Sequence, residues 1–419
     1  MSEESVRARR RFIAGLGVAP VAGLAYAAIA DSERGVPASS AVDRQAESSE
    51  YLLSPGLIHL NTASLGATPR AVFDRVMQAW RELESDPVRM AYSTTEDTVL
   101  SATEKVRERA AGFLGCDPDE LLLTRCTTDG MNNVAQSIRW NAGDRVLTTD
   151  QEHHGGNLGW LYQTQRRGIL LDRITIAPDD HDQAVIVQRF AAAITPATRV
   201  ISVSHVITST GLRMPIAEIS SLAREHGILC VVDGAQAVGG FPIDVKALGC
   251  HAYAASGHKW LMGPKGTGLL YVARDAWPAM KPIQWQDEHH YGAESAGVGP
   301  LPLVLGLGAA IERLQAMGMS EVERRGLALR NRAYIGLKQI AKLRVVSPPP
   351  GTMATAMVAC ELPAGIDSKT VRDFLRSKHS IVVKMVEKQW FNGIRISPHV
   401  LNTDADIDAL LRALRPLLA

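Results

Sequence analysis

The sequence has few cysteines and almost no net charge, and both shortages exclude classes of function. No CxxC pair exists among the five cysteines, which excludes a zinc site of the usual spacing and a thioredoxin-like centre. We expect most of them to be buried small apolar residues: Cys116, Cys126, Cys230, Cys250 and Cys360. The formal net charge is +1, and the basic residues are scattered. We therefore expect no nucleic-acid partner and no binding to an acidic membrane surface.

Long apolar runs are also rare, and the conspicuous one follows the arginines near the N-terminus. The string RRRFI at residues 9–13 precedes an apolar run of small residues that continues to Ala30. This pattern resembles a twin-arginine export signal. A membrane-spanning helix is the alternative, but the run is only modestly hydrophobic. We predict a signal peptide over residues 1–30, a polar linker over 31–50, export to the periplasm by the twin-arginine machinery, and no stable membrane insertion.

Strand and helix patterns alternate along the rest of the chain. Strands are predicted near residues 120–124, 145–149, 170–176, 200–203 and 228–232, with helical segments such as 98–114 and 216–226 among them. The alternation predicts an α/β fold whose mostly parallel sheet forms a large domain over residues 51–289. A smaller α+β domain is predicted over residues 290–419, with helices near 303–317, 320–342 and 404–417 and strands near 345–362 and 381–396. The first residues of the large domain are expected to join this smaller domain.

The stretch from Ile228 to Val272 carries the most informative chemistry. An apolar run ends at Asp233, and Lys259 ends the string SGHK that follows a second semi-apolar segment. Alone, the aspartate is explained by a helix cap or a turn, and the lysine by a solvated surface. Together they suit pyridoxal phosphate, which needs a lysine for its aldehyde and a carboxylate for its ring nitrogen.

The strings DGAQAVG, SGHKW and GPKGTGLLYV resemble the core of the class V aminotransferases, which are fold-type I pyridoxal-phosphate enzymes. That family includes cysteine desulfurases, isopenicillin N epimerase-like proteins and kynureninases. The resemblance covers about residue 58 to the C-terminus, and it implies a homodimer with sites at the subunit interface. It assigns Lys259 to the Schiff base and to proton transfer, Asp233 to the ring nitrogen, and Gln236 to the phenolic oxygen of the ring.

The phosphate of the cofactor needs donors that occupy little space. Thr127 and Thr128 lie between a strand and the start of a helix, where backbone N–H groups and the helix dipole favour anions. A simple helix N-cap is the alternative explanation of this string. The resemblance implies that Thr128 binds the phosphate, with Thr127 a weaker candidate, and that Ser256 and His258 also contact it.

The remaining candidate residues are implied by the same resemblance. In the string QEHH, His153 matches the histidine that stacks on the pyridine ring and could assist proton transfer. A metal ion is disfavoured there, because adjacent residues on a strand point to opposite faces. Arg395 matches the arginine that binds the substrate α-carboxylate, and Asn61 matches the loop at the substrate entrance. Thr208 replaces the asparagine that the family places near the substrate amine.

Two departures limit the choice of reaction. Cysteine desulfurases carry a nucleophilic cysteine before the C-terminal arginine strand, and no cysteine lies between Gly365 and Ile396. A persulfide-forming reaction by that route is therefore not expected. The family's string AGT, whose threonine reaches the phosphate of the partner subunit, corresponds here to residues 296–298 with Val298 in place of threonine.

Taken together, the sequence predicts an exported, pyridoxal-phosphate-dependent homodimer that acts on the α-amino group of an amino acid or a related metabolite. Transamination is the first choice. Epimerisation is the second, and β-elimination or C–S lysis is the third, because all share a carbanion at Cα. A protein that keeps the cofactor only as a binding or structural module is the non-enzymatic alternative, but that role does not need the whole set of site residues.

Overall fold

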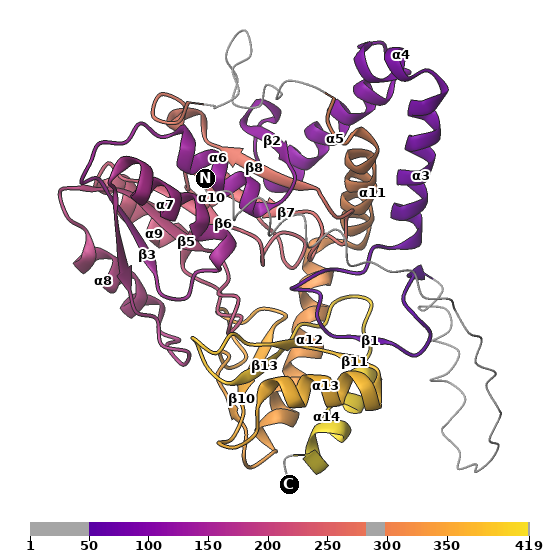
Figure 1. Ribbon diagram of the computed structural model, residues 1–419, viewed down its shortest axis with the longest axis vertical. Coiled ribbons are helices and arrows are strands. Elements are labelled where there is room, and N and C mark those ends of the chain that lie inside the picture. Colours follow the sequence, from indigo (N-terminus) through magenta and orange to yellow (C-terminus); the bar gives the residue numbers. More distant parts are fainter. Residues whose placement is uncertain (1–49, 282–297, 418–419) are drawn as a thin grey trace, which may run out of the picture. The chain divides into compact units, whose positions relative to one another are not determined.

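The computed structural model describes residues 50–281 and 298–417. The predicted export signal, the linker before Glu50 and the domain boundary near residue 290 lie outside these residues. Within them the main sheet has the strand order β2-β8-β7-β6-β5-β3-β4 (Figure 1). Its strands are β2 (Leu121–Thr124), β3 (Arg145–Thr149), β4 (Leu170–Ile174), β5 (Thr198–Ser204), β6 (Leu229–Asp233), β7 (Ala252–Ser256) and β8 (Gly268–Val272). Strand β8 runs antiparallel to both β2 and β7, and the other neighbouring strands pair in parallel, so the predicted mostly parallel α/β sheet is confirmed.

The central strands of this sheet are apolar runs because helices cover them. Each residue of β7 and β8 is buried, as are the last four residues of β6. Such continuous burial is typical of strands covered on both faces. The helices that alternate with the strands are α6 (Thr127–Ser137), α7 (His154–Arg167), α8 (Gln183–Ala193), α9 (Ile216–Glu225) and α10 (Val245–Leu248). Helix α6 packs on β7 and β8, and α9 packs on β6.

A second group of helices packs beside the sheet. It contains α3 (Arg70–Ser85), α4 (Pro87–Tyr92), α5 (Val99–Leu114) and α11 (Leu301–Met317), and α3 and α11 run side by side (Figure 1). Their close approach depends on glycine: a Cβ atom on Gly306 would lie 2.3 Å from Cγ2 of Val76 on α3. On the same helix, a Cβ atom on Gly308 would lie 2.5 Å from Cγ2 of Val106 on α5. Any side chain at either position would push these helices apart.

The C-terminal residues form a separate hydrophobic core. Among the described residues, its antiparallel sheet has the order β12 (Lys384–Met385), β13 (Gly393–Ile396), β10 (Val358–Glu361) and β9 (Arg344–Val345). Helices α12 (Met319–Lys338), α13 (Ser368–His379) and α14 (Asp404–Leu417) pack with it. The early strand β1 (Ile58–His59) pairs in parallel with β11 (Ile381–Val382), and Leu60 is buried in this core. No helix in the described part of the chain is both long and apolar enough to cross a bilayer.

The structure corrects two of the strand predictions. The predicted strand at 345–362 is two short strands, because the three prolines at 348–350 cannot donate ladder hydrogen bonds. The predicted strand at 381–396 is divided into β11, β12 and β13. Residues 386–392 leave the sheet between β12 and β13, and we call them the β12–β13 loop. The helix expected at 320–342 ends at Lys338.

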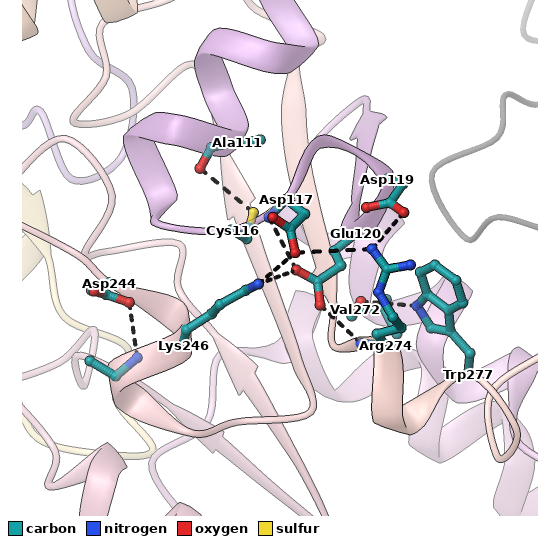
Figure 2. Close-up of polar contacts among 11 residues, drawn as sticks. Ala111, Cys116, Asp117, Asp119, Glu120, Asp244, Lys246, Val272, Arg274 and Trp277 are labelled. Atoms are coloured by element: carbon teal, nitrogen blue, oxygen red, sulfur yellow. Dashed lines mark hydrogen bonds and ion pairs between the residues drawn. The ribbon is translucent and has the colours of Figure 1, made fainter.

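A buried carboxylate ties one edge of the main sheet together. Glu120, at the end of the 3₁₀ helix η1 (Pro118–Glu120), is only 3% exposed. Its two oxygens accept hydrogen bonds from the backbone N–H groups of Asp117 and Arg274, each at 3.1 Å, and it forms an ion pair with Lys246 at 3.1 Å (Figure 2). Arg274 also pairs with Asp119 at 2.6 Å. One side chain therefore joins the segments that precede β2 and follow β8.

Candidate active site

A cavity of about 360 Å³ opens at the carboxyl ends of the parallel strands. This is the edge at which α/β sheets bind ligands, because the connecting loops leave the sheet there. The C-terminal sheet supplies a second wall. All but one of the predicted site residues line this cavity: Thr127, Thr128, His153, Thr208, Asp233, Gln236, Ser256, His258, Lys259 and Arg395. The exception is Asn61, whose Oδ1 lies 3.4 Å from Nη2 of Arg395.

The predicted lysine and aspartate come from neighbouring strands. Asp233 is the last residue of β6 and is 5% exposed, and its Oδ1 accepts from the backbone N–H of Ala235 at 2.9 Å. Lys259 follows β7. Burial lowers the pKa of Lys259 to about 8, although the negative charge of Asp233 opposes that shift. Its ammonium makes no hydrogen bond or ion pair with a described residue, so the amine is available to a ligand.

The start of α6 forms one end of the cavity. Its N-cap residue, Cys126, makes no side-chain cap, and the backbone N–H of Thr127 donates to Oγ of Ser256 at 2.9 Å. Nδ1 of His258 is buried without a hydrogen-bond partner, and burial lowers the pKa of His258 to about 4, which leaves the ring neutral. Helix N-termini with uncapped N–H groups attract phosphate. The end that holds Thr127, Thr128, Ser256 and His258 therefore fits a phosphate group.

The start of α7 lies beside the start of α6, because a Cβ atom on Gly155 would lie 2.5 Å from Oγ1 of Thr128. His153 is the N-cap of this helix, and its Nδ1 accepts from the backbone N–H of Gly155 at 3.1 Å. Burial lowers the pKa of His153, which favours a neutral ring. A Cβ atom on Gly156 would lie 2.5 Å from Oδ2 of Asp233, so glycine keeps the space beside the carboxylate open.

The reasoning that placed His153 and His154 on a strand was wrong. Strand β3 ends at Thr149, and the two histidines are the N-cap and the first residue of α7. The helix begins here because an imidazole nitrogen can satisfy a free backbone N–H at the N-terminus. Within residues 50–281 and 298–417, no group of three or more His, Cys, Asp or Glu side chains could hold a metal ion.

Gln236 is already held by protein groups. Its Nε2 donates to the carbonyl oxygen of Ala63 at 3.0 Å and to Oγ1 of Thr208 at 3.3 Å. Its Oε1 accepts from the indole N–H of Trp260 at 2.9 Å. Both amide hydrogens of Gln236 are therefore used. To donate to the cofactor ring, Gln236 must give up a bond to the protein, and the longer one, to Thr208, is the weaker of the two.

Arg395 is a buried cation that lacks an anionic partner among the described residues. It is 3% exposed. Its Nη1 donates to the carbonyl oxygen and Oγ1 of Thr208, both at 2.8 Å, and its Nη2 donates to Oγ of Ser64 at 3.1 Å. Its Nε is buried without a partner, and burial lowers the pKa of Arg395 to about 10. Buried charges are normally paired, so this guanidinium fits a carboxylate supplied by a ligand. Because both Nη atoms already donate to protein groups, such a carboxylate would replace the longest of these bonds, the one to Asn61 at 3.4 Å.

Apart from Arg395, sequence reasoning missed the part of the cavity that the C-terminal residues provide. Lys384, Val386, Glu387 and Trp390 all line it, from β12 and the β12–β13 loop. Nζ of Lys384 lies 3.6 Å from Glu387, and the indole N–H of Trp390 donates to the carbonyl oxygen of Asp150 at 3.2 Å. No local pattern in the sequence marks these residues, because the fold brings them to the cavity from more than a hundred residues away.

The cysteines are all in the described part of the chain and none is in a disulfide. Cys230, Cys250 and Cys360 are buried, as expected for small apolar side chains. Cys126 lines the cavity, but it lies at the start of α6 beside the predicted phosphate end. The β12–β13 loop offers no thiol.

Comparisons with known proteins agree with this geometry. The family model described as aminotransferase class V matches residues 58–410. An isopenicillin N epimerase from Amycolatopsis lactamdurans is 31% identical over 388 residues, which cover 87% of this chain and 96% of that protein. A probable cysteine desulfurase from Synechocystis sp. is 28% identical over 384 residues and covers 86% and 90% of the two chains.

Solved structures show the same fold. The cysteine desulfurase CsdA from Escherichia coli superposes with a TM-score of 0.76 at 25% identity, covering 90% of this chain and 98% of that chain. A form of the protein C-DES with glycine covalently linked to its pyridoxal-phosphate cofactor has a TM-score of 0.78 at 22% identity, covering 86% and 97%.

The cavity has one end that suits an anion, the unpaired amine of Lys259, and the carboxylate of Asp233 beside a space that Gly156 keeps open. These features fit pyridoxal 5′-phosphate, the cofactor of this family. Thr127, Thr128, Ser256 and His258 would hold its phosphate, Asp233 its ring nitrogen and Lys259 its aldehyde carbon. With the family model matching from strand β1 into helix α14, this chain belongs to the class V aminotransferase family of fold-type I pyridoxal-phosphate enzymes.

Proposed function

We propose that this chain catalyses a reaction at the α-amino group of an amino acid or an amino-acid-derived compound, with transamination as the first candidate. One observation carries the proposal. Arg395, buried and without an anionic partner, lines the same cavity as the unpaired amine of Lys259. A substrate with both a carboxylate and an amine satisfies both groups at once.

Each residue has a separate task in this proposal. Pyridoxal phosphate, when bound, withdraws electrons from the α-carbon of the substrate. Arg395 holds the carboxylate and so orients the Cα–H bond. Lys259, with a pKa lowered to about 8, is neutral in about one molecule in ten at pH 7, far more often than an ordinary lysine, and its Nζ accepts the Cα proton. Asp233 supports a protonated nitrogen on the cofactor, and the flat neutral ring of His153 supports its face.

The test is the visible absorbance of the purified holoprotein with a panel of amino acids, followed by product analysis. We expect an absorbance change with at least one amino acid and a keto acid as the product. Lys259→Ala should abolish turnover, and Lys265→Ala is a matched control in the following loop. The absence of any spectral response would favour a protein that keeps the cofactor only as a binding module.

Epimerisation is the second candidate because the cavity holds a second amine. Lys384 reaches it from β12, whereas Lys259 follows β7 in the main sheet. Two bases in one site can remove a proton and return one to the other face of the α-carbon. The isopenicillin N epimerase relative supports this candidate. In heavy water, epimerisation would yield an inverted product carrying deuterium at Cα, and Lys384→Met would suppress inversion more than proton loss.

β-Elimination or C–S lysis is the third candidate, and relatives named cysteine desulfurase support it. The β12–β13 loop has no cysteine to take up the sulfur, so we do not propose a persulfide on that loop. Release of free sulfide or of an enamine-derived keto acid from cysteine would select this branch. A keto acid that retains the intact side chain would select transamination instead.

We further propose that the protein works as a homodimer. Helix α3 exposes Phe73 by 43%, Met77 by 38% and Trp80 by 43%, all on one side of the helix. Apolar side chains gathered on one exposed helix face are typical of a protein interface. Light scattering during gel filtration should give twice the mass of the chain, and Trp80→Glu should shift it toward the monomer. At the predicted cross-subunit position, Val298 is exposed.

Export remains a proposal that rests on the sequence RRRFI. Replacing Arg9 and Arg10 with lysine should retain the protein in the cytoplasm, because the twin-arginine machinery reads that pair. Fractionation of cells that express the full chain measures this. Unchanged export would refute the proposal and leave the assignment of the active site intact.

A further inference from the structure

A second cavity, of about 570 Å³, lies next to the active site. The indole of Trp390 lines both cavities and is the residue that they share. Its N–H donates to the carbonyl oxygen of Asp150 at 3.2 Å, which holds the β12–β13 loop against the segment between β3 and α7. Trp390 therefore acts as the wall between the two spaces.

The start of α7 completes the division. His153 lines the active-site cavity, whereas Glu152 and His154 on either side of it line the second cavity. The cofactor and the α-carboxylate group occupy the first cavity in the proposed function. A substrate side chain that extends past Trp390 would enter the second one.

The acidic and carbonyl groups of the second cavity are already used by the protein. Glu152 accepts from Oγ1 of Thr149 at 2.8 Å and from Oγ of Ser204 at 2.5 Å. Asp150 accepts through Oδ1 from the backbone N–H of Ile176 at 3.0 Å. Gln151 accepts through Oε1 from Ser209 at 2.9 Å. These oxygens therefore offer little to a ligand.

The basic groups of the same cavity are not used in this way. Arg173, an exposed residue on strand β4, lines the cavity, and its guanidinium forms no ion pair or hydrogen bond with a described residue. The imidazole of His154 and the side-chain amide of Asn157, both on α7, likewise have no partner in the described part of the chain. The second cavity thus presents a free cation and free donors, and those groups suit an anion.

We infer that the second cavity binds the side-chain end of an extended substrate, and that this end carries a carboxylate which pairs with Arg173. The inference rests on the proposed function, since Arg395 is taken to hold the α-carboxylate. It assigns the substrate to the α-amino acids whose side chain is several carbons long and ends in an acidic group. Trp390 would determine how such a chain passes from one cavity to the other.

Ligands that cannot react test this inference separately from the chemistry. Straight-chain dicarboxylates from succinate to suberate would be titrated into the holoenzyme by calorimetry, with hexanoate as the monocarboxylate control. We expect the dissociation constant to fall as the chain lengthens. The best dicarboxylate should bind at least about tenfold more tightly than hexanoate, the effect of one charge-assisted hydrogen bond.

Variants then locate the second carboxylate. Arg173→Gln should remove most of that tenfold preference and leave hexanoate binding within about twofold. Arg166→Gln is the matched control, because Arg166 is an exposed arginine on α7 that lines neither cavity. Trp390→Ala should flatten the dependence on chain length, because the wall between the cavities is gone.

Two results would overturn the inference while the proposed function stands. One is the same affinity for all dicarboxylates in a protein that responds spectrally to amino acids. The other is an equal effect of Arg173→Gln and Arg166→Gln. A holoprotein without any spectral response to amino acids would instead remove the proposed function, and the inference with it.

Discussion

Replacing Arg395 with lysine tests the central feature of the active site. The guanidinium makes four hydrogen bonds, to the carbonyl oxygen and Oγ1 of Thr208, to Asn61 and to Ser64, and these bonds fix its plane. A lysine keeps the positive charge but not the planar fork. Arg395→Lys should therefore weaken the binding of substrates through their carboxylate, while the charge inside the cavity stays the same.

The size of the effect follows from burial. Truncating one partner of a buried, hydrogen-bonded charge pair costs roughly 2–5 kcal/mol. Because lysine retains part of the attraction, we take about 3 kcal/mol, which corresponds to roughly a hundredfold change in affinity. The half-saturating concentration of an amino acid should rise by that factor. A simple primary amine, which has no carboxylate, should change by less than about threefold.

The assay is the absorbance change of the holoprotein as a function of ligand concentration, for one amino acid and one amine of equal size. Arg330→Lys is the control, because Arg330 is also fully buried and burial lowers its pKa to about 10 as well, but it contacts backbone carbonyls away from the cavity. Equal half-saturation of Arg395→Lys and the wild type for the amino acid would refute the assignment of the carboxylate site.

Three further predictions concern protonation and stability. The apoprotein should capture pyridoxal phosphate faster as pH rises, with a midpoint near 8, because only neutral Lys259 attacks the aldehyde; a midpoint near 10.5 in stopped-flow absorbance would contradict its lowered pKa. Burial raises the pKa of Glu152 to about 7, so the stability that its protonated form contributes is present below pH 4.5 and is lost as pH rises through 7. Glu152→Gln should therefore reduce the loss of unfolding free energy between pH 5 and pH 8 by up to roughly 3 kcal/mol, which thermal melts would show as a smaller fall in Tm. An unchanged fall would contradict this account. Glu120→Ala should lower the free energy of unfolding by about 3 kcal/mol in urea titrations, since two backbone N–H groups lose their acceptor. Lys246→Ala should lower it by less than about 1 kcal/mol, because that lysine is half exposed; similar losses for both variants would argue against the role of the buried carboxylate.

Much of the main sheet could be predicted because its signals are local. Apolar runs such as ILCVV report burial between helices, and the polar residue at the end of each run marks the edge where a parallel sheet binds ligands. Asp233 and Lys259 could therefore be assigned to one site from the sequence, and the family resemblance added Ser256. The family motifs added the cofactor, and the structure brings the same residues to one cavity.

The C-terminal wall of the site was decided by tertiary contacts. Arg395 binds Thr208 across 187 positions, and Trp390 binds the backbone of Asp150 across 240. No periodicity in the sequence predicts a contact between residues so far apart along the chain. Each pair meets only after the two separate hydrophobic cores have packed against each other. The prolines at 348–350 and the β12–β13 loop also divided segments whose apolar patterns resembled continuous strands.

The sequence by itself determined the fold class, through its alternating strand and helix patterns, and the cofactor and the site residues of the main sheet, through short motifs at strand ends. What only the tertiary structure decided was which other side chains line the cavities: Lys384, Glu387 and Trp390 in the first cavity, and Arg173 in the second. The physical reason is that chemistry on the cofactor needs a few fixed groups, whereas the shape of a substrate site depends on surfaces that become neighbours only in the folded chain.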